Sequence, residues 1–123
     1  MTGERFVPTD WPRVIPRIIV HDVEGLVKFL RTVFGATGDV PDGAPVVLNI
    51  GKSLIMVSDG GGVRPHFPAF LYVYVEDADA AYARALAQGA SSVEAPLDTP
   101  YGDRRAMVED RWGNTWQLAT HRG

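Results

Sequence analysis

The sequence contains no cysteine among its 123 residues. This absence excludes a disulfide framework, a thiolate zinc site and a cysteine nucleophile. No apolar run approaches the roughly 20 residues that a membrane-spanning helix needs. The segment Met1–Arg5 also lacks the basic region, followed by an apolar stretch, that is typical of a secretory signal. We therefore expect a soluble protein of the cytoplasm that has no membrane partner.

Positive charge is also scarce in this sequence. Twelve Lys and Arg residues against fifteen Asp and Glu residues give a net charge of −3. Proteins that bind nucleic acid generally carry an excess of positive charge, which neutralises the phosphates. We therefore expect no nucleic-acid partner. Hydrophobic residues make up 46% of the chain. That content and length favour one domain with a real core rather than two domains.

The first half of the chain predicts a strand, a helix and two further strands. The expected segments are 14–20, 22–35, 46–50 and 53–58, followed by a glycine-rich linker from Asp59. Pro16 cannot donate a hydrogen bond to a neighbouring strand, so the first strand should lie at a sheet edge or bulge there. Asp22 is a typical helix N-cap, and Gly35 is a typical end of a helix.

The second half repeats this order. It predicts a strand over 70–75, a helix from Asp77 or Asp79 to Gly89, a short strand over 92–95, a loop over 97–103, and strands over 104–109 and 115–120. A β-α-β-β-β unit thus occurs twice, and each unit is too small to bury its own sheet face. We expect one domain over residues 1–123, with an arm (1–12), module one (about 13–59), a linker (about 60–67) and module two (about 68–121).

Three motifs, in this order, connect the chain to a known superfamily. They are Ile19-Val20-His21-Asp22, Tyr74-Val75-Glu76-Asp77-Ala78-Asp79-Ala80-Ala81, and Glu109-Asp110-Arg111-Trp112-Gly113-Asn114-Thr115-Trp116. From Val14 to His121 the chain resembles the vicinal oxygen chelate superfamily, which includes glyoxalases, extradiol dioxygenases, fosfomycin-resistance enzymes and bleomycin-resistance proteins. Tyr101-Gly102-Asp103-Arg104 is similar to a segment of the bleomycin-resistance-like subgroup. The resemblance implies an α+β fold in which two paired β-α-β-β-β modules form an open, barrel-like cup, and it implies a homodimer.

Metal-dependent members of that superfamily place a His or Glu at four strand positions that face the cup. In this sequence the four positions fall on Ile15, Ile55, Phe70 and Gln117. Divalent cations need carboxylate, imidazole or similar donors, and these residues do not supply them. We therefore expect no metal, no other cofactor and no catalytic residue. The histidines His21, His66 and His121 do not converge on the cup in the repeat, and we interpret them as surface or capping residues.

Strand alternation predicts which side chains line the cup. Facing inward are expected Arg17, Ser53, Ile55, Val57, Phe70, Tyr72, Tyr74, Thr115, Gln117 and Ala119, while Trp116 should pack against a helix. The candidate ligand-binding residues are Arg17, Ile55, Phe70, Tyr72, Tyr74, Tyr101, Trp112 and Gln117. For the aromatic residues on the strands, packing along the sheet or against a dimer partner is the alternative interpretation. For Tyr101 and Trp112 the alternative is packing within their turns.

An apolar, aromatic concavity with a few polar groups is typical of an organic-ligand pocket. The expected function is metal-independent, reversible binding of a small aromatic or amphipathic molecule, such as an antibiotic or secondary metabolite held away from its target. Arg17 and the scarcity of carboxylates in the cup favour a neutral or anionic ligand. Two alternatives stay open: a glyoxalase-like lyase or isomerase, or dioxygenase-type enzyme, with an atypical site, and an interaction module whose cup is closed.

Overall fold

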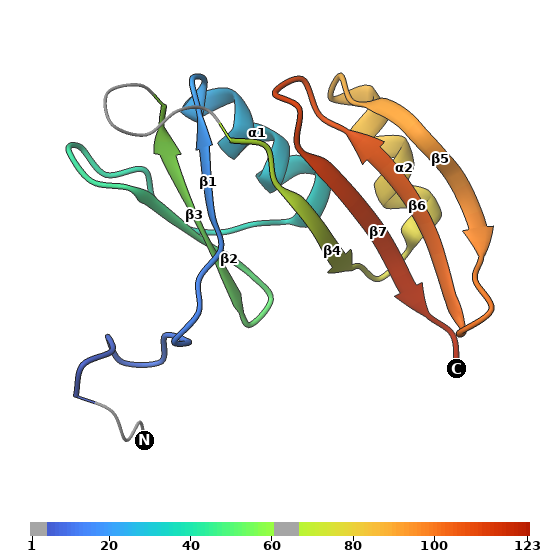
Figure 1. Cartoon of the computed structure of the whole chain (residues 1–123), viewed down its shortest axis with the longest axis horizontal. Helices are drawn as coiled ribbons and strands as arrows, with labels where there is room; N and C mark the ends of the chain where they lie inside the picture. Colours follow the sequence, from blue (N-terminus) through green and yellow to red (C-terminus); the bar gives the residue numbers. More distant parts are fainter. Residues whose placement is uncertain (1–4, 61–66) are drawn as a thin grey trace.

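The chain forms two consecutive modules, each with one helix packed on a β-sheet. The computed structural model describes residues 5–60 and 67–123, and within them it contains two helices and seven strands (Figure 1). Module one contains β1 (Arg17–Val20), α1 (Val23–Phe34), β2 (Val46–Ile50) and β3 (Ser53–Asp59). Module two contains β4 (Phe70–Tyr74), α2 (Ala78–Ala87), β5 (Ser91–Asp98), β6 (Asp103–Glu109) and β7 (Thr115–His121). The predicted α+β class is confirmed.

The two sheets have related topologies. The first has the strand order β1-β3-β2, and the second has the order β4-β7-β6-β5, with the first and last strands of each module parallel. Module two is a complete β-α-β-β-β unit. In module one, the strand that would correspond to β5 is reduced to a single antiparallel bridge between Thr37 and Asn49. The segment after Thr37 contains Gly38, Pro41, Gly43 and Pro45, which interrupt a regular strand.

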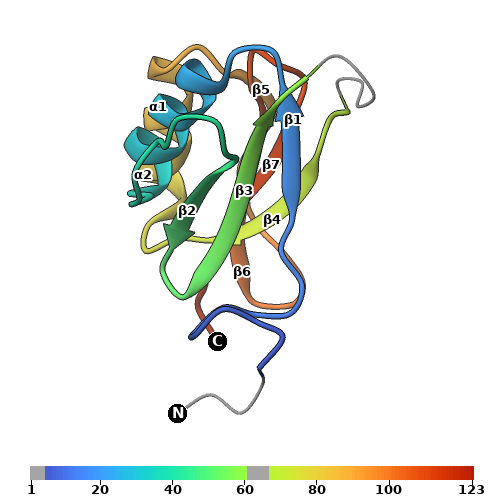
Figure 2. The ribbon, with the colours of Figure 1, turned by 90° about the vertical axis from the view of Figure 1, so that its left-hand side faces the viewer.

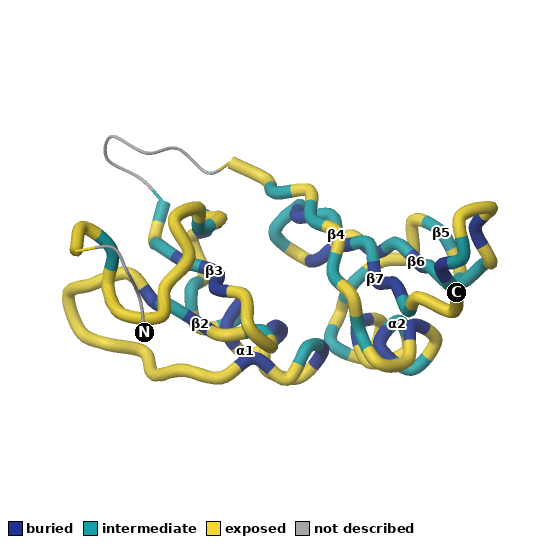
Figure 3. The backbone as a smooth tube through the Cα atoms, turned by 90° about the horizontal axis from the view of Figure 1, so that it is seen from below, coloured by how far each residue is buried: buried dark blue, intermediate teal, exposed yellow. Residues whose placement is uncertain are grey.

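Both helices lie on the same side of the two sheets, and the opposite sheet faces are left open (Figures 1 and 2). The modules are joined on the helix side by Arg84 of α2, whose Nη2 donates to the carbonyl oxygen of Val33 in α1 at 2.9 Å. On the sheet side, an antiparallel bridge joins Ile19 of β1 to Phe67, just before β4. Along β4 the exposure alternates between exposed and intermediate residues, as Figure 3 shows. Every second side chain of β4 is therefore presented to solvent on the open face of its sheet.

Both helices begin where an aspartate caps them. Asp22 accepts a hydrogen bond from the backbone N–H of Gly25 at 2.9 Å, and Asp77 accepts one from Ala80 at 3.1 Å. The predicted end of the first helix is also confirmed, because Gly35 adopts a left-handed conformation with φ of 69°. Among the described residues no helix is long and apolar enough to span a membrane. Residues 61–66, which include most of the expected linker and His66, lie outside the described residues.

The core lies between the helices and the sheets. Trp116 of β7 is fully buried, and its ring centroid lies 6.3 Å from Phe29 and 5.2 Å from Phe34 of α1. The indole Nε1 donates to a carboxylate oxygen of Asp110 at 2.9 Å, so its polar group is satisfied. This confirms that Trp116 packs against a helix. Because α1 thus contacts a strand of module two, the two modules share one core.

Two predicted strand boundaries are wrong. The first strand begins at Arg17 and not at Val14, because Pro16 has no N–H to donate, although its carbonyl oxygen accepts from Met56 at 2.9 Å. The short strand predicted over 92–95 extends over Ser91–Asp98, and register shifts along it accommodate Pro96. The loop expected over 97–103 is consequently reduced to four residues, 99–102.

Replacing Gly25 by alanine should lower the free energy of unfolding, although alanine favours helices over glycine by about 1 kcal/mol. A Cβ atom at Gly25 would meet the capping carboxylate of Asp22, and it would lie 2.7 Å from Cζ2 of Trp112. We expect Gly25→Ala to cost about 1–3 kcal/mol in urea unfolding. Thr32→Ala, at an exposed position of the same helix, is the control and should be neutral or slightly stabilising. A stabilised Gly25→Ala variant would show that this contact is not tight.

Candidate functional site

The open face of the second sheet carries a row of aromatic side chains. In the parallel pairing of β4 with β7, Phe70 lies beside Thr115, Tyr72 beside Gln117 and Tyr74 beside Ala119. Side chains of laterally paired residues point to the same face. The relative exposures of Phe70, Tyr72 and Tyr74 are 66%, 37% and 61%, so these rings are accessible within a single chain. The alternation predicted for β4 and β7 is therefore present.

The alternation predicted for β3 is wrong. Its parallel pairing with β1 places Val57 beside Ile18, and both side chains are fully buried under the helix. Ile55 has the same parity as Val57, is 5% exposed and belongs to the core cluster. Arg17 lies beside Met56 on the open face, as expected, and its Nε donates to Oγ of Ser58 at 2.9 Å. Leu54, Met56 and Ser58 thus take the face that was assigned to Ser53, Ile55 and Val57.

A buried carboxylate organises the polar groups of the second open face. The side chain of Asp103 is 1% exposed. Its Oδ2 accepts hydrogen bonds from the hydroxyls of Tyr72, at 2.6 Å, and Tyr74, at 2.9 Å. Its Oδ1 lies 2.7 Å from Nδ1 of His121. We call these four residues the Asp103 network.

Two further residues extend the Asp103 network across the sheet. The hydroxyl of Tyr101 lies 3.3 Å from that of Tyr72, and Nη1 of Arg105 donates to the Tyr101 hydroxyl at 2.9 Å. Nη2 of Arg105 also binds Glu94 at 2.8 Å. Tyr101, expected from the sequence to contact a ligand, is therefore brought together with Tyr72.

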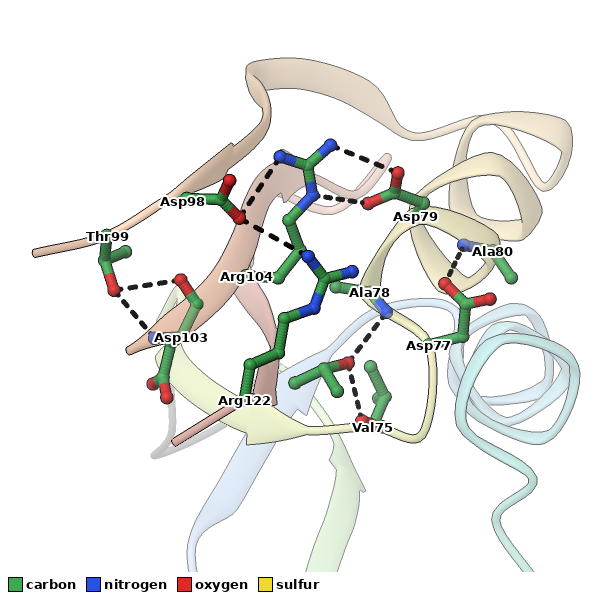
Figure 4. A network of polar contacts seen from close by, with 11 residues as sticks. Val75, Asp77, Ala78, Asp79, Ala80, Asp98, Thr99, Asp103, Arg104 and Arg122 are labelled. Atoms are coloured by element: carbon green, nitrogen blue, oxygen red, sulfur yellow. Dashed lines mark hydrogen bonds and ion pairs between the residues drawn. The ribbon is translucent and has the colours of Figure 1, made fainter. Parts of the chain in front are cut away.

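The loop before β6 fixes the position of Asp103. The backbone N–H of Asp103 donates to Oγ1 of Thr99 at 3.0 Å, and this hydroxyl donates to the Asp103 carbonyl oxygen at 2.9 Å. Gly102 has φ of 93°, and a Cβ atom there would lie 3.4 Å from Cε1 of His121. Figure 4 shows that the Asp103 carboxylate points away from Arg104, whose guanidinium instead binds Asp79. Successive residues of β6 thus serve opposite faces of the sheet.

The Asp103 network also sets the ionisation of its members. Hydrogen bonds from Tyr72 and His121 hold the pKa of Asp103 below its usual value, although desolvation opposes them. Burial, together with the hydrogen bond to Asp103, raises the pKa of Tyr72. The hydrogen bond to Asp103 is the main cause that raises the pKa of Tyr74. Asp103 therefore stays ionised near neutral pH, and both phenols stay protonated as donors.

Gln117 occupies the middle of this face with its amide available. It lies between Tyr72 of β4 and Met107 of β6 in the sheet and is partly exposed. Within residues 5–60 and 67–123, its side chain makes no hydrogen bond. Trp112, by contrast, was expected near the cup and lies on the helix side, with its ring edge-to-face against Phe29 at 6.4 Å. That position removes Trp112 from the candidate site.

An apolar groove of about 430 Å³ adjoins the aromatic row. Its walls come from the N-terminal arm, from the β2–β3 turn with the start of β3, and from β4. They include Val14, Pro16, Lys52, Leu54, Leu71 and Tyr72. The volume lies within the range of small-molecule pockets, roughly 300–1,000 Å³. Since Tyr72 and Tyr74 belong to both the groove and the Asp103 network, the apolar and polar parts of the site are continuous.

The donor set for a catalytic metal does not fit this chain. Ile15, Ile55 and Phe70 have no donor atoms, and Gln117 supplies one neutral amide. The residues that take the open face of β3 in place of Ile55 do not supply a metal ligand either, because Leu54 and Met56 carry neither carboxylate nor imidazole. In the described part of the chain, no three side chains of His, Asp or Glu come together in a way that could hold a metal ion.

Comparison with known proteins assigns this architecture to a family. The model of the Glyoxalase/Bleomycin resistance protein/Dioxygenase superfamily matches residues 13–118, and the chain belongs to this superfamily. The chain is 32% identical to the uncharacterized protein Mb0911c of Mycobacterium bovis over an alignment of 129 positions, which covers 87% of this chain and 82% of that protein. This superfamily has the vicinal oxygen chelate fold that the motifs predicted.

Solved structures share the fold over almost the whole chain. TioX from Micromonospora sp. ML1 superimposes with a TM-score of 0.75 at 26% identity, covering 89% of this chain and 98% of that one. A glyoxalase/bleomycin resistance protein/dioxygenase family enzyme from Burkholderia phytofirmans PsJN superimposes with a TM-score of 0.72 at 21% identity, covering 87% and 96%. At 21% identity the second similarity shows the fold alone.

The sequence did not indicate that Asp103 and His121 would be paired. His121 was interpreted as a surface histidine, and Asp103 was assigned to the end of a loop. The structure instead places them side by side, because the antiparallel pairing of β6 with β7 aligns Asp103 with His121. The sequence shows only that β6 begins with a polar residue and that β7 ends with one. Recognising the pair requires the pairing register, which follows from the whole sheet.

Alkaline titration should show Tyr72 and Tyr74 ionising above the range of an ordinary tyrosine. An unfolded chain ionises its tyrosines at about pH 10. Because the folded pKa values are raised, the stability that rests on these protonated phenols is fully present below that pH and is lost as the pH rises through the folded values. Phenolate absorbance and melting temperature, followed together in alkaline buffers, measure both effects.

Asp103→Asn tests whether the Asp103 carboxylate raises the pKa values of Tyr72 and Tyr74, since it removes the negative charge that the phenols face. The late-ionising tyrosines should then shift towards lower pH, whereas Tyr82→Phe on α2 should only reduce the total absorbance change. If all four tyrosines of the wild type ionised over the same pH range, the hydrogen bonds from Tyr72 and Tyr74 to Asp103 would be contradicted. In acid, the contribution of Asp103 is present above about pH 4 and is lost as the pH falls through its lowered pKa.

Proposed function

We propose that this chain is a metal-independent binding protein that holds a small aromatic or amphipathic molecule against the open face of its second sheet. One observation carries the proposal: the partly exposed Gln117 amide, without a partner among the described residues, lies beside exposed Tyr72, and Tyr72 in turn lines an apolar groove of about 430 Å³. A planar ligand would stack on the aromatic row and direct a polar group to Gln117. Apolar walls with a few oriented polar groups are the usual chemistry of such sites.

The charge of the site favours a neutral or anionic ligand. Glu109, beside Thr115 on the same face, is exposed, but it lies at the opposite end of β6 from the Asp103 network. Asp103 and Glu94, which hold Tyr72 and Arg105, are already bound to donors of the protein. They are therefore poor partners for a cationic ligand. Lys52 lines the groove and adds a positive charge at its edge. Arg17, expected to contact the ligand, lies on the open face of the other sheet, where it binds Ser58.

The proposed biological role is to hold an antibiotic or secondary metabolite away from its target. Support comes from membership of a superfamily that includes bleomycin-resistance proteins. It also comes from the metal positions, which lack the donors that the enzymes of the superfamily use. Reversible binding requires affinity and shape but no metal ion, and an apolar groove beside exposed aromatic side chains is typical of a surface that binds in this way.

We also propose that the chain is a homodimer in which the open faces of two copies face each other. Each copy has two such faces, and the second exposes Phe70 and Tyr74 by 66% and 61%. Exposed aromatic patches of this kind are typical of association surfaces. Sedimentation should show a dimer, and Phe70→Glu should dissociate it, while Val40→Glu, at an exposed loop position elsewhere, should not. A wild-type monomer at high concentration would contradict the proposal.

Gln117→Leu should weaken the binding of a polar aromatic ligand by about fivefold, because one amide hydrogen bond contributes on the order of 1 kcal/mol. Its effect on a purely apolar ligand should be small. Tyr72→Ala should weaken both kinds of ligand by roughly tenfold, since it removes an aromatic contact together with buried area. Tyr82→Phe, on the helix side of the sheet, is the control and should bind both normally.

The measurement is a fluorescence titration with a panel of aromatic metabolites, repeated with a chelator in the buffer. We expect the same Kd values with and without the chelator. A ligand that bound equally well to the wild type, Gln117→Leu and Tyr72→Ala would place the binding site elsewhere. Binding that was lost on adding the chelator would overturn the metal-independent proposal.

A further inference from the structure

The imidazole of His121 is oriented by a buried anion, and its second nitrogen makes no hydrogen bond to the described part of the chain. Its side chain is 60% exposed, whereas that of Asp103, 2.7 Å from Nδ1, is 1% exposed. The Asp103 carboxylate already accepts hydrogen bonds from Tyr72 and Tyr74, so it is an ionised acceptor. Nδ1 of His121 must therefore be the protonated donor. In the neutral ring, Nε2 then carries the lone pair, and it is the nitrogen that the network leaves unused.

We propose that Nε2 of His121 accepts the proton of an acidic hydroxyl group, a phenol or an enol, on the bound aromatic ligand. The inference rests on the proposed function, and it names the chemical class of the ligand. The O–H bond of the ligand breaks, its proton forms an N–H bond at Nε2, and the electron pair remains on the ligand oxygen. The products are an imidazolium and an oxyanion that form an ion pair.

The surroundings of His121 favour this transfer. The imidazolium would lie between the ligand oxyanion and the Asp103 carboxylate, so its positive charge is balanced on both sides. Tyr72 and Tyr74 face the same carboxylate from β4, and Tyr101 faces Tyr72 from the 99–102 loop.

Two arginines also lie near His121, and each forms an ion pair with an acidic side chain. Arg105 of β6 binds Glu94 and Tyr101, and Arg122, next along the chain, forms an ion pair with Asp98 at 3.5 Å. Within the Asp103 network, His121 is the base that these pairings leave for a ligand. Asp103 acts on the ligand only through the ring, so it is a positioning residue.

The 99–102 loop lies against the ring of His121 and thereby determines how a ligand reaches the imidazole. Gly102 approaches Cε1 so closely that a Cβ atom would lie 3.4 Å away. The adjacent Tyr101 is 55% exposed and presents its hydroxyl to Tyr72. A ligand stacked on the tyrosines of β4 would then have its hydroxyl at the end of the sheet where the imidazole lies.

The experiment uses 4-nitrophenol, whose ionised form absorbs visible light, and 4-nitroanisole, its methyl ether, which has no proton to transfer. Both are titrated into the full chain at a pH where free 4-nitrophenol is mostly protonated. We expect bound 4-nitrophenol to show the absorbance of the phenolate. His121→Gln should abolish that absorbance and weaken 4-nitrophenol roughly tenfold, while the Kd of 4-nitroanisole stays unchanged. His21→Gln, which removes a histidine beside α1, is the matched control and should behave as the wild type.

Asp103→Asn separates positioning from a purely structural role. It retains the imidazole but removes the anion opposite it, so the imidazolium formed by the transfer loses its counter-charge. The pH at which bound 4-nitrophenol ionises should therefore rise. An unchanged pH, in a variant whose circular dichroism is normal, would overturn the positioning role of Asp103.

The remaining outcomes distinguish the two proposals. If both probes bind, but 4-nitrophenol stays protonated or His121→Gln changes nothing, the proton-acceptor inference is wrong and the proposed binding function stands. If neither probe binds, this inference fails together with the proposed aromatic site. If 4-nitrophenol binds as the phenolate in the wild type and in His21→Gln, but not in His121→Gln, the inference is supported.

Discussion

The candidate site depends on a carboxylate that is removed from water. Asp103 is almost inaccessible, and a buried anion is tolerated only when hydrogen bonds replace its hydration. Two phenols from β4 and an imidazole from β7 supply these bonds, while the carboxylate itself comes from β6. One anion therefore ties three strands together on the face that no helix covers. Ala119, which pairs with Tyr74 on that open face, is fully buried.

The fold permits several chemistries, and the residues on its open face decide among them. The superfamily is established by the match over residues 13–118, but the positions that carry a metal in its enzymes are here apolar or amide side chains. In their place the chain has two phenols in edge-to-face contact, a Gln117 amide without a partner among the described residues, and a histidine oriented by Asp103. Groups of this kind are suited to the proposed binding of an organic molecule, which requires no metal ion.

The sequence predicted the parts of the fold that local chemistry determines. The caps at Asp22 and Asp77 and the alternation along β4 follow from residue type and period. It failed where a partner distant in sequence decides the outcome. The face of Ile55 depends on how β1 pairs with β3, and the pairing of Asp103 with His121 depends on the register of β6 with β7. Registers of this kind are set by the packing of the whole sheet.

The central claim is that ligands bind on the open face of the second sheet, where the Gln117 amide has no partner within residues 5–60 and 67–123. The most direct test follows the side-chain amide of Gln117 and the ring protons of Tyr72 by nuclear magnetic resonance while an aromatic ligand is added. The account predicts that these signals move first and furthest, because the ring current of a stacked ligand acts at short range. Shifts confined to the helix side around Trp112, with the signals of Gln117 and Tyr72 unchanged, would contradict it.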